Sequence, residues 1–231
     1  MKSPIAVVLA VFVSSSLVFA QETPNFTTGT KALLFTFDGF SNLAAGNFEG
    51  GFGGKYYLSP STALRAGVQL TTVSEDIPAN PPEGSQGEDG ELSASRFGVS
   101  GALEWHRNAG RVSPYLGLGL GFATTSTESR TAEDGNPPSE PTEIKNDDDG
   151  LRIDGETFFG GSALSFFGMA GVEFFLFKEV SLAAEYRFGF RRISRKDQEV
   201  TSGTFESTTE VGGSSGFGIN SAGALTLAVY F

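Results

Sequence analysis

Residues 216–231, GFGINSAGALTLAVYF, end the chain on an aromatic residue within a strand-like pattern. Positions counted back from the end in steps of two form an apolar set, and the positions between them form a small or polar set. The apolar set is Phe231, Val229, Leu227, Leu225, Gly223, Ser221, Ile219 and Phe217, and the other set is Tyr230, Ala228, Thr226, Ala224, Ala222, Asn220 and Gly218. A period of two residues indicates a β-strand whose faces meet different environments. Membrane-spanning barrels are built from such strands, each about 9 to 11 residues long.

Seven further segments show the same alternation. They are residues 32–38, 48–58, 63–73, 92–106, 115–124, 157–176 and 180–191. Tight turns at residues 59–62, 107–114 and 177–179 alternate along the chain with long polar stretches at 75–91, 126–156 and 192–215. This organisation predicts an all-β fold, an eight-stranded antiparallel up-and-down transmembrane barrel with short turns at one end and long loops at the other. The Pro-rich, acidic stretch 126–156 is expected to lie outside any core.

The composition excludes several classes of protein. There is no cysteine, which rules out a disulfide framework, a thiolate metal site and a lipid anchor on cysteine. A short positive start at Lys2, an apolar run over residues 5–13 and Val18-Phe19-Ala20 predict a signal peptide over residues 1–20. Without Lys2 the chain carries 15 basic and 27 acidic residues, a net charge of −12, so nucleic acid is not an expected partner.

The charged residues of the eight segments all fall on the face opposite the apolar one. They are Asp38, Glu49, Glu104, Glu173 and Glu185 with Lys55, Arg65, Arg96, Arg187 and Arg191. An Arg or Lys at the bilayer midplane costs about 2 to 4 kcal/mol, so this face is predicted to point inward. Five acids and five bases permit the pairing that buried charges require. Since eight strands enclose only enough space for side chains, a plugged barrel is expected rather than an open pore.

The inward face also carries glycines. Gly117, Gly119 and Gly121 alternate with leucines, and no helix pattern follows them, so they are interpreted as making room inside the barrel rather than as a phosphate loop. The alternative fold is a soluble lipocalin-like barrel that buries the apolar set. It is disfavoured, because its outer wall would be glycine-rich and sparsely charged.

Several stretches resemble the small OmpA-like and OmpX-like outer-membrane β-barrel family. They are GFGGKYYLS at residues 51–59, SPYLGLGLGF at 113–122, GMAGVEFFLFKEVSLAAEYRF at 168–188 and the terminal Phe231. The resemblance implies a monomer in the outer membrane of a Gram-negative cell, with outer-membrane lipid around it and Phe231 as a signal for the barrel assembly machinery. Residues 21–30 are then a short periplasmic lead, and residues 31–231 are the barrel domain.

Three motifs could carry chemistry, and each also has a structural interpretation. Residues 212–216, GGSSG, match the G-x-S-x-G pattern of serine hydrolases, but they precede a strand rather than a helix. His106, the only histidine, shares the inward face with Glu104 and could form half of an acid–base pair. Its place beside a tight turn favours a rim histidine near the interfacial Trp105.

The third motif is KNDDDGLRIDGE at residues 145–156, which matches part of an EF-hand loop. Asp147, Asp149, Gly150 and Glu156 stand at its third, fifth, sixth and twelfth places, but Lys145 occupies the first, where an acid is needed. The default interpretation is a solvated acidic loop, and divalent cations are candidate partners of the acidic loops.

The leading functional hypothesis is an integral outer-membrane protein without enzymatic activity. Its interior would be plugged by paired charges, Glu49, Lys55, Arg65, Arg96, Glu104, Glu173, Glu185 and Arg187. Its acidic surface loops would serve structural or interaction roles. No catalytic residue, cofactor or tightly bound metal is expected. The alternatives are a narrow channel or carrier for small or hydrophobic solutes and, third, a lipid A-modifying enzyme that uses His106.

Overall fold

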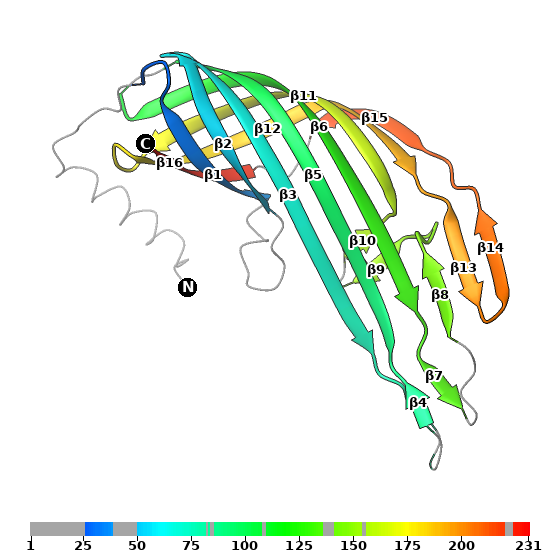
Figure 1. Ribbon diagram of the computed structural model, residues 1–231. Helices are drawn as coiled ribbons and strands as arrows, with labels where there is room; N and C mark the ends of the chain where they lie inside the picture. Colours follow the sequence, from blue (N-terminus) through cyan, green and yellow to red (C-terminus); the bar gives the residue numbers. More distant parts are fainter. Residues whose placement is uncertain are drawn as a thin grey trace, which may run out of the picture.

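Eight antiparallel strands form a closed barrel, which confirms the predicted fold class (Figure 1). The computed structural model describes residues 26–38, 50–81, 83, 86–107, 110–135, 141–153, 156–219 and 224–231. The barrel strands are β1 (Lys31–Asp38), β2 (Gly50–Ser59), β3 (Thr62–Ile77), β5 (Gly90–His106), β6 (Val112–Arg130), β11 (Gly161–Phe175), β12 (Val180–Arg195) and β16 (Ala224–Tyr230). Each pairs with the next in this order, and β16 pairs with β1 to close the barrel. No helix in the described residues is long and apolar enough to span a membrane.

The two ends of the barrel differ. Tight turns join β2 to β3, β5 to β6 and β11 to β12 at one end, which we call the turn end. The backbones of Lys31 and Phe231 pair at the same end, with N···O distances of 3.3 and 3.0 Å. The opposite end, which we call the loop end, carries the remaining strands. The predicted signal peptide at residues 1–20 lies outside the described residues.

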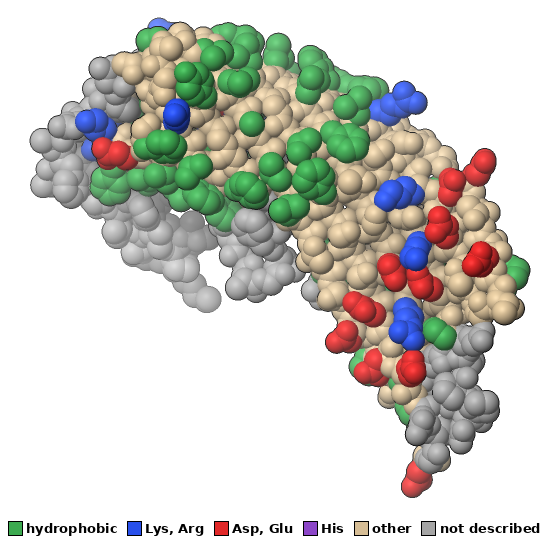
Figure 2. Space-filling model, viewed as in Figure 1, with side chains coloured by type: hydrophobic (Ala, Val, Ile, Leu, Met, Phe, Trp, Pro, Cys, Tyr) green, Lys and Arg blue, Asp and Glu red, His purple; other side chains and the backbone are tan. Residues whose placement is uncertain are grey.

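The outward face of the barrel is apolar over the band nearest the turn end. Leu116, Leu118 and Leu120 of β6 are 64, 49 and 59% exposed, whereas the neighbours between them are glycines facing inward. Figure 2 shows hydrophobic side chains around this part of the molecule and charged ones over the strands beyond it. This distribution fits a barrel whose outer wall contacts hydrocarbon.

Several strands are longer than the sequence pattern predicts, whereas the predicted segment 157–176 divides into β10 (Glu156–Phe158) and β11. β3, β5 and β6 have 16, 17 and 19 residues, whereas about 9 to 11 suffice to cross a bilayer. The prediction of a loop over residues 75–91 is therefore wrong at both ends, since the β3–β5 ladder continues to the pair Ile77 and Gly90. Beyond the apolar band the strands carry polar side chains. Their backbone N–H and C=O groups still hydrogen-bond across the ladder, so the pairing continues without contact with lipid.

Shorter strands lie at the loop end (Figure 1). They are β4 (Gln86–Glu88), β7 (Glu133–Gly135), β8 (Thr142–Lys145), β13 (Gln198–Ser202), β14 (Phe205–Thr209) and β15 (Ser214–Ile219). β4 and β7 form a separate two-stranded sheet, and the others extend the barrel sheet. β8 pairs with β6 and β13, β13 pairs with β14, and β15 pairs with β12 beside β16. The last predicted strand thus comprises β15 and β16.

A second small core lies at the loop end. β9 (Leu151–Ile153) and β10 (Glu156–Phe158) form a hairpin whose Leu151, Ile153 and Phe158 are buried against Ala94 of β5. The expectation that residues 126–156 lie outside any core is therefore wrong. Three-residue strands are too short to show a period of two, and the acids and prolines around them dominated the composition of the stretch.

Candidate functional site

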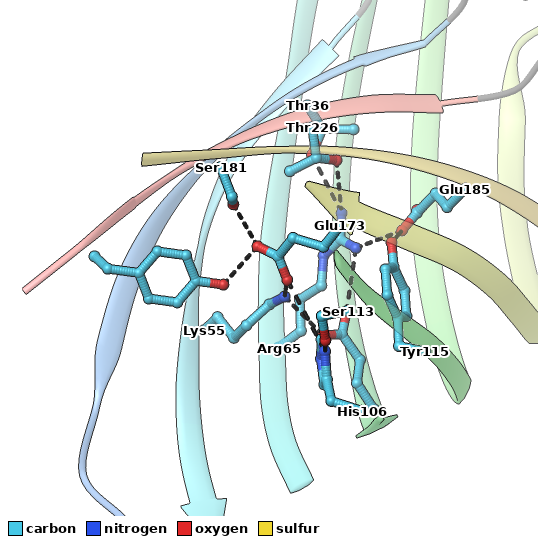
Figure 3. A network of polar contacts seen from close by, with 12 residues as sticks. Thr36, Lys55, Arg65, His106, Ser113, Tyr115, Glu173, Ser181, Glu185 and Thr226 are labelled. Atoms are coloured by element: carbon cyan, nitrogen blue, oxygen red, sulfur yellow. Dashed lines mark hydrogen bonds and ion pairs between the residues drawn. The ribbon is translucent and has the colours of Figure 1, made fainter. Parts of the chain in front are cut away.

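The inward face of the turn-end half of the barrel holds three carboxylates and three cationic side chains in one network. Figure 3 shows the part of it around Lys55, Arg65, Glu173 and Glu185. The charged members of the network are Lys55 on β2, Arg65 on β3, Glu104 on β5, Glu173 on β11, and Glu185 and Arg187 on β12. The alternation of each strand places these residues inside, because their neighbours in sequence are the lipid-facing apolar residues. Five strands contribute, so the network ties together opposite walls of the barrel.

Glu104 lies at the centre of the network and has no exposed surface. Its carboxylate contacts Lys55 Nζ at 3.0 Å, Arg65 Nη1 at 3.3 Å and His106 Nε2 at 3.0 Å. One carboxylate therefore serves two cations and an imidazole. A buried charge needs this density of partners, since removal from water costs several kcal/mol before any pairing.

Glu173 is the second buried carboxylate. It accepts hydrogen bonds from Lys55 Nζ at 3.2 Å, from Tyr230 Oη at 2.6 Å and from the hydroxyl of Ser181. Lys55 belongs to β2, Ser181 to β12 and Tyr230 to β16, so Glu173 joins its own strand, β11, to three others. The sequence placed Tyr230 on the inward set, but it did not indicate which carboxylate the hydroxyl would meet.

Glu185 connects the two arginines. Arg65 Nη1 donates to it at 2.7 Å, Arg187 Nη2 at 2.6 Å and Tyr115 Oη at 2.8 Å. The other terminal nitrogen of Arg65, Nη2, lies 3.3 Å from Thr36 Oγ1 on β1, so the guanidinium is held from several walls at once. Such geometry fixes the arginine in one orientation.

Apolar side chains fill the space beside the charges. Met169 and Phe167 of β11 lie opposite the glycines of β6, as the interpretation of those glycines predicts. A Cβ at Gly119 would stand 2.5 Å from the Phe167 ring, and one at Gly117 would stand 2.8 Å from Met169 Cγ. Glycine is therefore required there so that larger neighbours can occupy the axis.

An aromatic cluster lies inside the barrel at the turn end. Phe26 stacks on Tyr57 with a centroid distance of 4.5 Å and also contacts Phe175 and Tyr230. All four residues are at least nine-tenths buried. Phe26 belongs to the segment predicted as a polar lead, and a single phenylalanine outside any periodic pattern gave no signal of this role.

His106 is not the rim residue that the sequence favoured, because its side chain is completely buried. Nδ1 lies 2.9 Å from Ser113 Oγ and Nε2 lies 3.0 Å from Glu104. The order Ser113, His106, Glu104 resembles a hydrolase triad, but Glu104 is already bound by two cations. Ser113 is 1% exposed, so a substrate would have to displace the surrounding core to reach it. The geometry is that of a structural network.

The remaining predicted residues lie elsewhere. Arg96 faces inward nearer the loop end and donates from Nε to Thr125 Oγ1 at 3.3 Å, outside the ion-pair network. Glu49 and the side chain of Asp38 lie outside the described part of the chain. The side chain of Phe231 is 72% exposed on the outer wall at the turn end.

The other two motifs lie on the loop-end surface. The G-x-S-x-G match at residues 212–216 leads into β15, not into a helix. Asp147, Asp148 and Asp149 bring carboxylate oxygens within 4.8 Å of one another, a spacing that could hold a cation. Lys145 pairs with Glu143 at 2.6 Å, and Glu156 begins β10, so the EF-hand pattern is not realised as a ligand loop.

Comparison with known families agrees with this architecture. A family model described as outer membrane protein beta-barrel domain matches residues 5–209, which is most of the chain. A search of curated proteins with the sequence of this chain found no match. The closed eight-stranded barrel, its apolar outer band and its polar interior are the features that such a domain requires in a bilayer. The chain therefore belongs to the outer-membrane β-barrel family and is an integral outer-membrane protein.

Proposed function

We propose that this protein is a non-enzymatic, closed barrel that anchors an acidic sheet outside the cell. The observation that carries the proposal is the interior network. In it Glu104, Glu173 and Glu185 contact cationic side chains from opposite walls of the barrel, and each glutamate is at most 1% exposed. The aromatic cluster around Phe26 lies below it at the turn end. Together these two layers support an interior plugged by its own side chains.

Conductance in planar bilayers tests the closed interior. The wild-type protein is expected to give no discrete current steps. A surface control, in which Glu143 and Lys145 are replaced by alanine, is also expected to give none. A variant with alanine at Phe26, Lys55 and Glu104 is expected to conduct. Current steps from the wild type would favour the narrow channel instead. A silent interior variant, shown to be folded by its heat-modifiable gel mobility, would contradict the plugging role of these side chains.

The proposed orientation places the turn end in the periplasm and the loop end outside the cell. Tight turns on one side and long strands on the other support it, since outer-membrane barrels have short periplasmic turns. Cleavage by protease added to intact cells should be confined to the loop-end strands.

The exposed Phe231 side chain supports a role as the signal read by the barrel assembly machinery. The test is the amount of folded barrel that cells produce from the F231A variant, compared with the wild type.

The loop-end surface is proposed to act through its charge. Residues 75–91 carry a net charge of −6 and residues 126–156 one of −7. Exposed acids on this surface include Glu88, Glu128, Asp148, Asp149, Glu199 and Glu206. Divalent cations and basic surfaces are the expected partners, with an association that weakens as salt rises. A variant with these acids neutralised should lose such binding. Unchanged binding would refute the role of the charge.

A further inference from the structure

The outer wall of β12 carries two basic residues just beyond the apolar band. Arg192 and Lys196 follow Phe190 on the face that points away from the barrel interior, and both are exposed. Lys196 continues the ladder past the end of β12, since its backbone N–H donates to the carbonyl of Gly160 at 3.2 Å. Figure 2 shows basic side chains between the hydrophobic part of the surface and most of the acidic side chains.

The position of Arg192 matches the height of a membrane. Arg192 follows Leu182, an outward residue near the turn end, by ten residues of β12. Ten residues of an antiparallel strand span about 34 Å. At a strand tilt of about 40° they rise about 26 Å along the membrane normal, and the apolar band of such barrels is about 25 Å tall. If the hydrocarbon begins at Leu182, Arg192 therefore lies at the opposite boundary, at the level of the lipid headgroups.

The surroundings of Arg192 leave its guanidinium available. In the strand register, Leu164 of β11 lies on one side of Arg192 and Ser215 of β15 on the other. The stem of the arginine can thus lie along apolar surface while the guanidinium reaches the headgroups. Within the described residues, the Arg192 side chain forms no hydrogen bond or ion pair. Its donors are therefore free to bind a ligand.

Hydroxyl groups, not carboxylates, surround the two cations. One row of hydroxyls crosses the outer faces of β6, β11 and β12 directly beyond Arg192, and it consists of Thr124, Ser162 and Ser194. Lys196 Nζ donates to Ser126 Oγ of β6 at 2.6 Å, so the lysine lies across the same surface. In the described parts of these three strands, no outward position carries a carboxylate before Glu128. The local charge is therefore positive, although the loop end as a whole is acidic.

We propose that Arg192 and Lys196 bind the phosphate-bearing headgroup of a membrane lipid on the outer wall of β12. The acyl chains of that lipid lie against the exposed Phe188 and Phe190, so the site continues the apolar surface that contacts hydrocarbon. A guanidinium offers two parallel donors to phosphate oxygens, and the ammonium group adds a second charge. The two residues are about 14 Å apart along the strand, a span that their long side chains narrow from both ends. Which leaflet holds this lipid in the cell rests on the proposed orientation of the barrel.

Quenching of a tryptophan by brominated lipid tests the proposal. The reporter protein carries W105F and F190W, so its single tryptophan lies on the outer wall two residues before Arg192. It is reconstituted into phosphatidylcholine vesicles that contain a minor fraction of brominated phosphatidic acid or, for comparison, of brominated phosphatidylcholine. Stronger quenching by phosphatidic acid is expected, because that lipid is enriched beside the reporter. Arg192→Gln and Lys196→Gln should each lower the enrichment about fivefold, the usual contribution of one cation near an anionic membrane surface.

The matched control is Arg152→Gln, which removes the same charge from an exposed residue of the β9–β10 hairpin, on the inner side of the sheet. Its enrichment should equal that of the unmodified reporter. Equal quenching by the two lipids would overturn the inference, and so would unchanged enrichment in both cation variants or an equal loss in the control. Both leaflets of the vesicles have the same composition, so the result is independent of the orientation, which protease cleavage on intact cells tests separately. Heat-modifiable gel mobility confirms that each variant is folded.

Discussion

Replacing Glu104 by glutamine should destabilise the barrel strongly. The carboxylate has no exposed surface and contacts Lys55, Arg65 and His106 within 3.3 Å. Glutamine keeps the size of the side chain but removes its charge. Three cations of the network would then face two carboxylates, and one positive charge would remain buried without compensation.

The expected size of the loss follows from how much pairing survives. Removing one partner of a buried ion pair costs about 3 to 5 kcal/mol, chiefly because the other charge stays buried. Lys55 keeps Glu173 at 3.2 Å and Arg65 keeps Glu185 at 2.7 Å, so we expect the lower end, about 3 kcal/mol of unfolding free energy. The matched control is E143Q, whose ion pair with Lys145 is exposed and should contribute less than about 1 kcal/mol.

Urea unfolding in lipid vesicles, followed by tryptophan fluorescence, measures both values. Trp105 is the only tryptophan, and its 44% exposed side chain lies on the outer wall beside Glu104. Its emission therefore reports when that wall leaves the lipid. The variant K55M/E104Q, which removes one charge of each sign, should lose less than the sum of the two single losses.

Two results would refute this reasoning. If E104Q unfolds within about 0.5 kcal/mol of the wild type, the carboxylate does not hold the barrel together, since that range is typical of surface substitutions. If the losses of the single variants simply add in the double variant, Lys55 and Glu104 are not coupled. A partially unfolded starting state would show as a changed slope of the urea transition rather than as a shifted midpoint.

Three further changes probe other parts of the barrel. Valine at Gly119 should lower the folding yield on heat-modifiability gels, because a Cβ there meets an inward phenylalanine ring at 2.5 Å, whereas valine at Gly216, with nothing within 4 Å, should not. Alanine at Phe26 should lower the unfolding free energy by about 3 to 5 kcal/mol, the usual cost of deleting a buried phenylalanine, and an unchanged urea midpoint would contradict its sealing role. Aspartate at Ile153 should expose the β9–β10 hairpin to protease, while aspartate at the exposed Arg152 should leave the cleavage rate unchanged; equal rates would disprove the loop-end core.

The alternation of side chains was sufficient to predict the eight barrel strands and their outer face. A period of two depends only on the local chain and on the contrast between lipid and interior. It therefore placed Leu116 outside and Tyr115 inside without any knowledge of the neighbours. The apolar band and the glycine row follow from the same contrast, which is why the fold could be derived from one sequence.

The partners of each interior charge could not be predicted this way. Lys55 meets Glu173 across 118 residues and Arg65 meets Glu185 across 120. Such contacts depend on the register and tilt of all eight strands, and period-two patterns do not specify either one. The tyrosine and serine hydroxyls that bind these carboxylates were missed for the same reason. Phe26 and the β9–β10 hairpin were missed because each is too short to be periodic.

The two halves of the barrel interior meet different electrostatic demands. Near the turn end Glu104, Glu173 and Glu185 are at most 1% exposed, so each charge must find a partner in the protein. Nearer the loop end, the inward side chains of Gln69, Thr71 and Arg96 keep exposed surface, and Arg96 donates a hydrogen bond to the hydroxyl of Thr125. The inward pattern is the same in both halves, and solvent access decides how strongly a charge depends on a partner within the protein. If Phe26 were removed, water would enter from the turn end as well. Part of the network would then lose its low-dielectric setting, and its charges would contribute less to stability than they do in the sealed barrel.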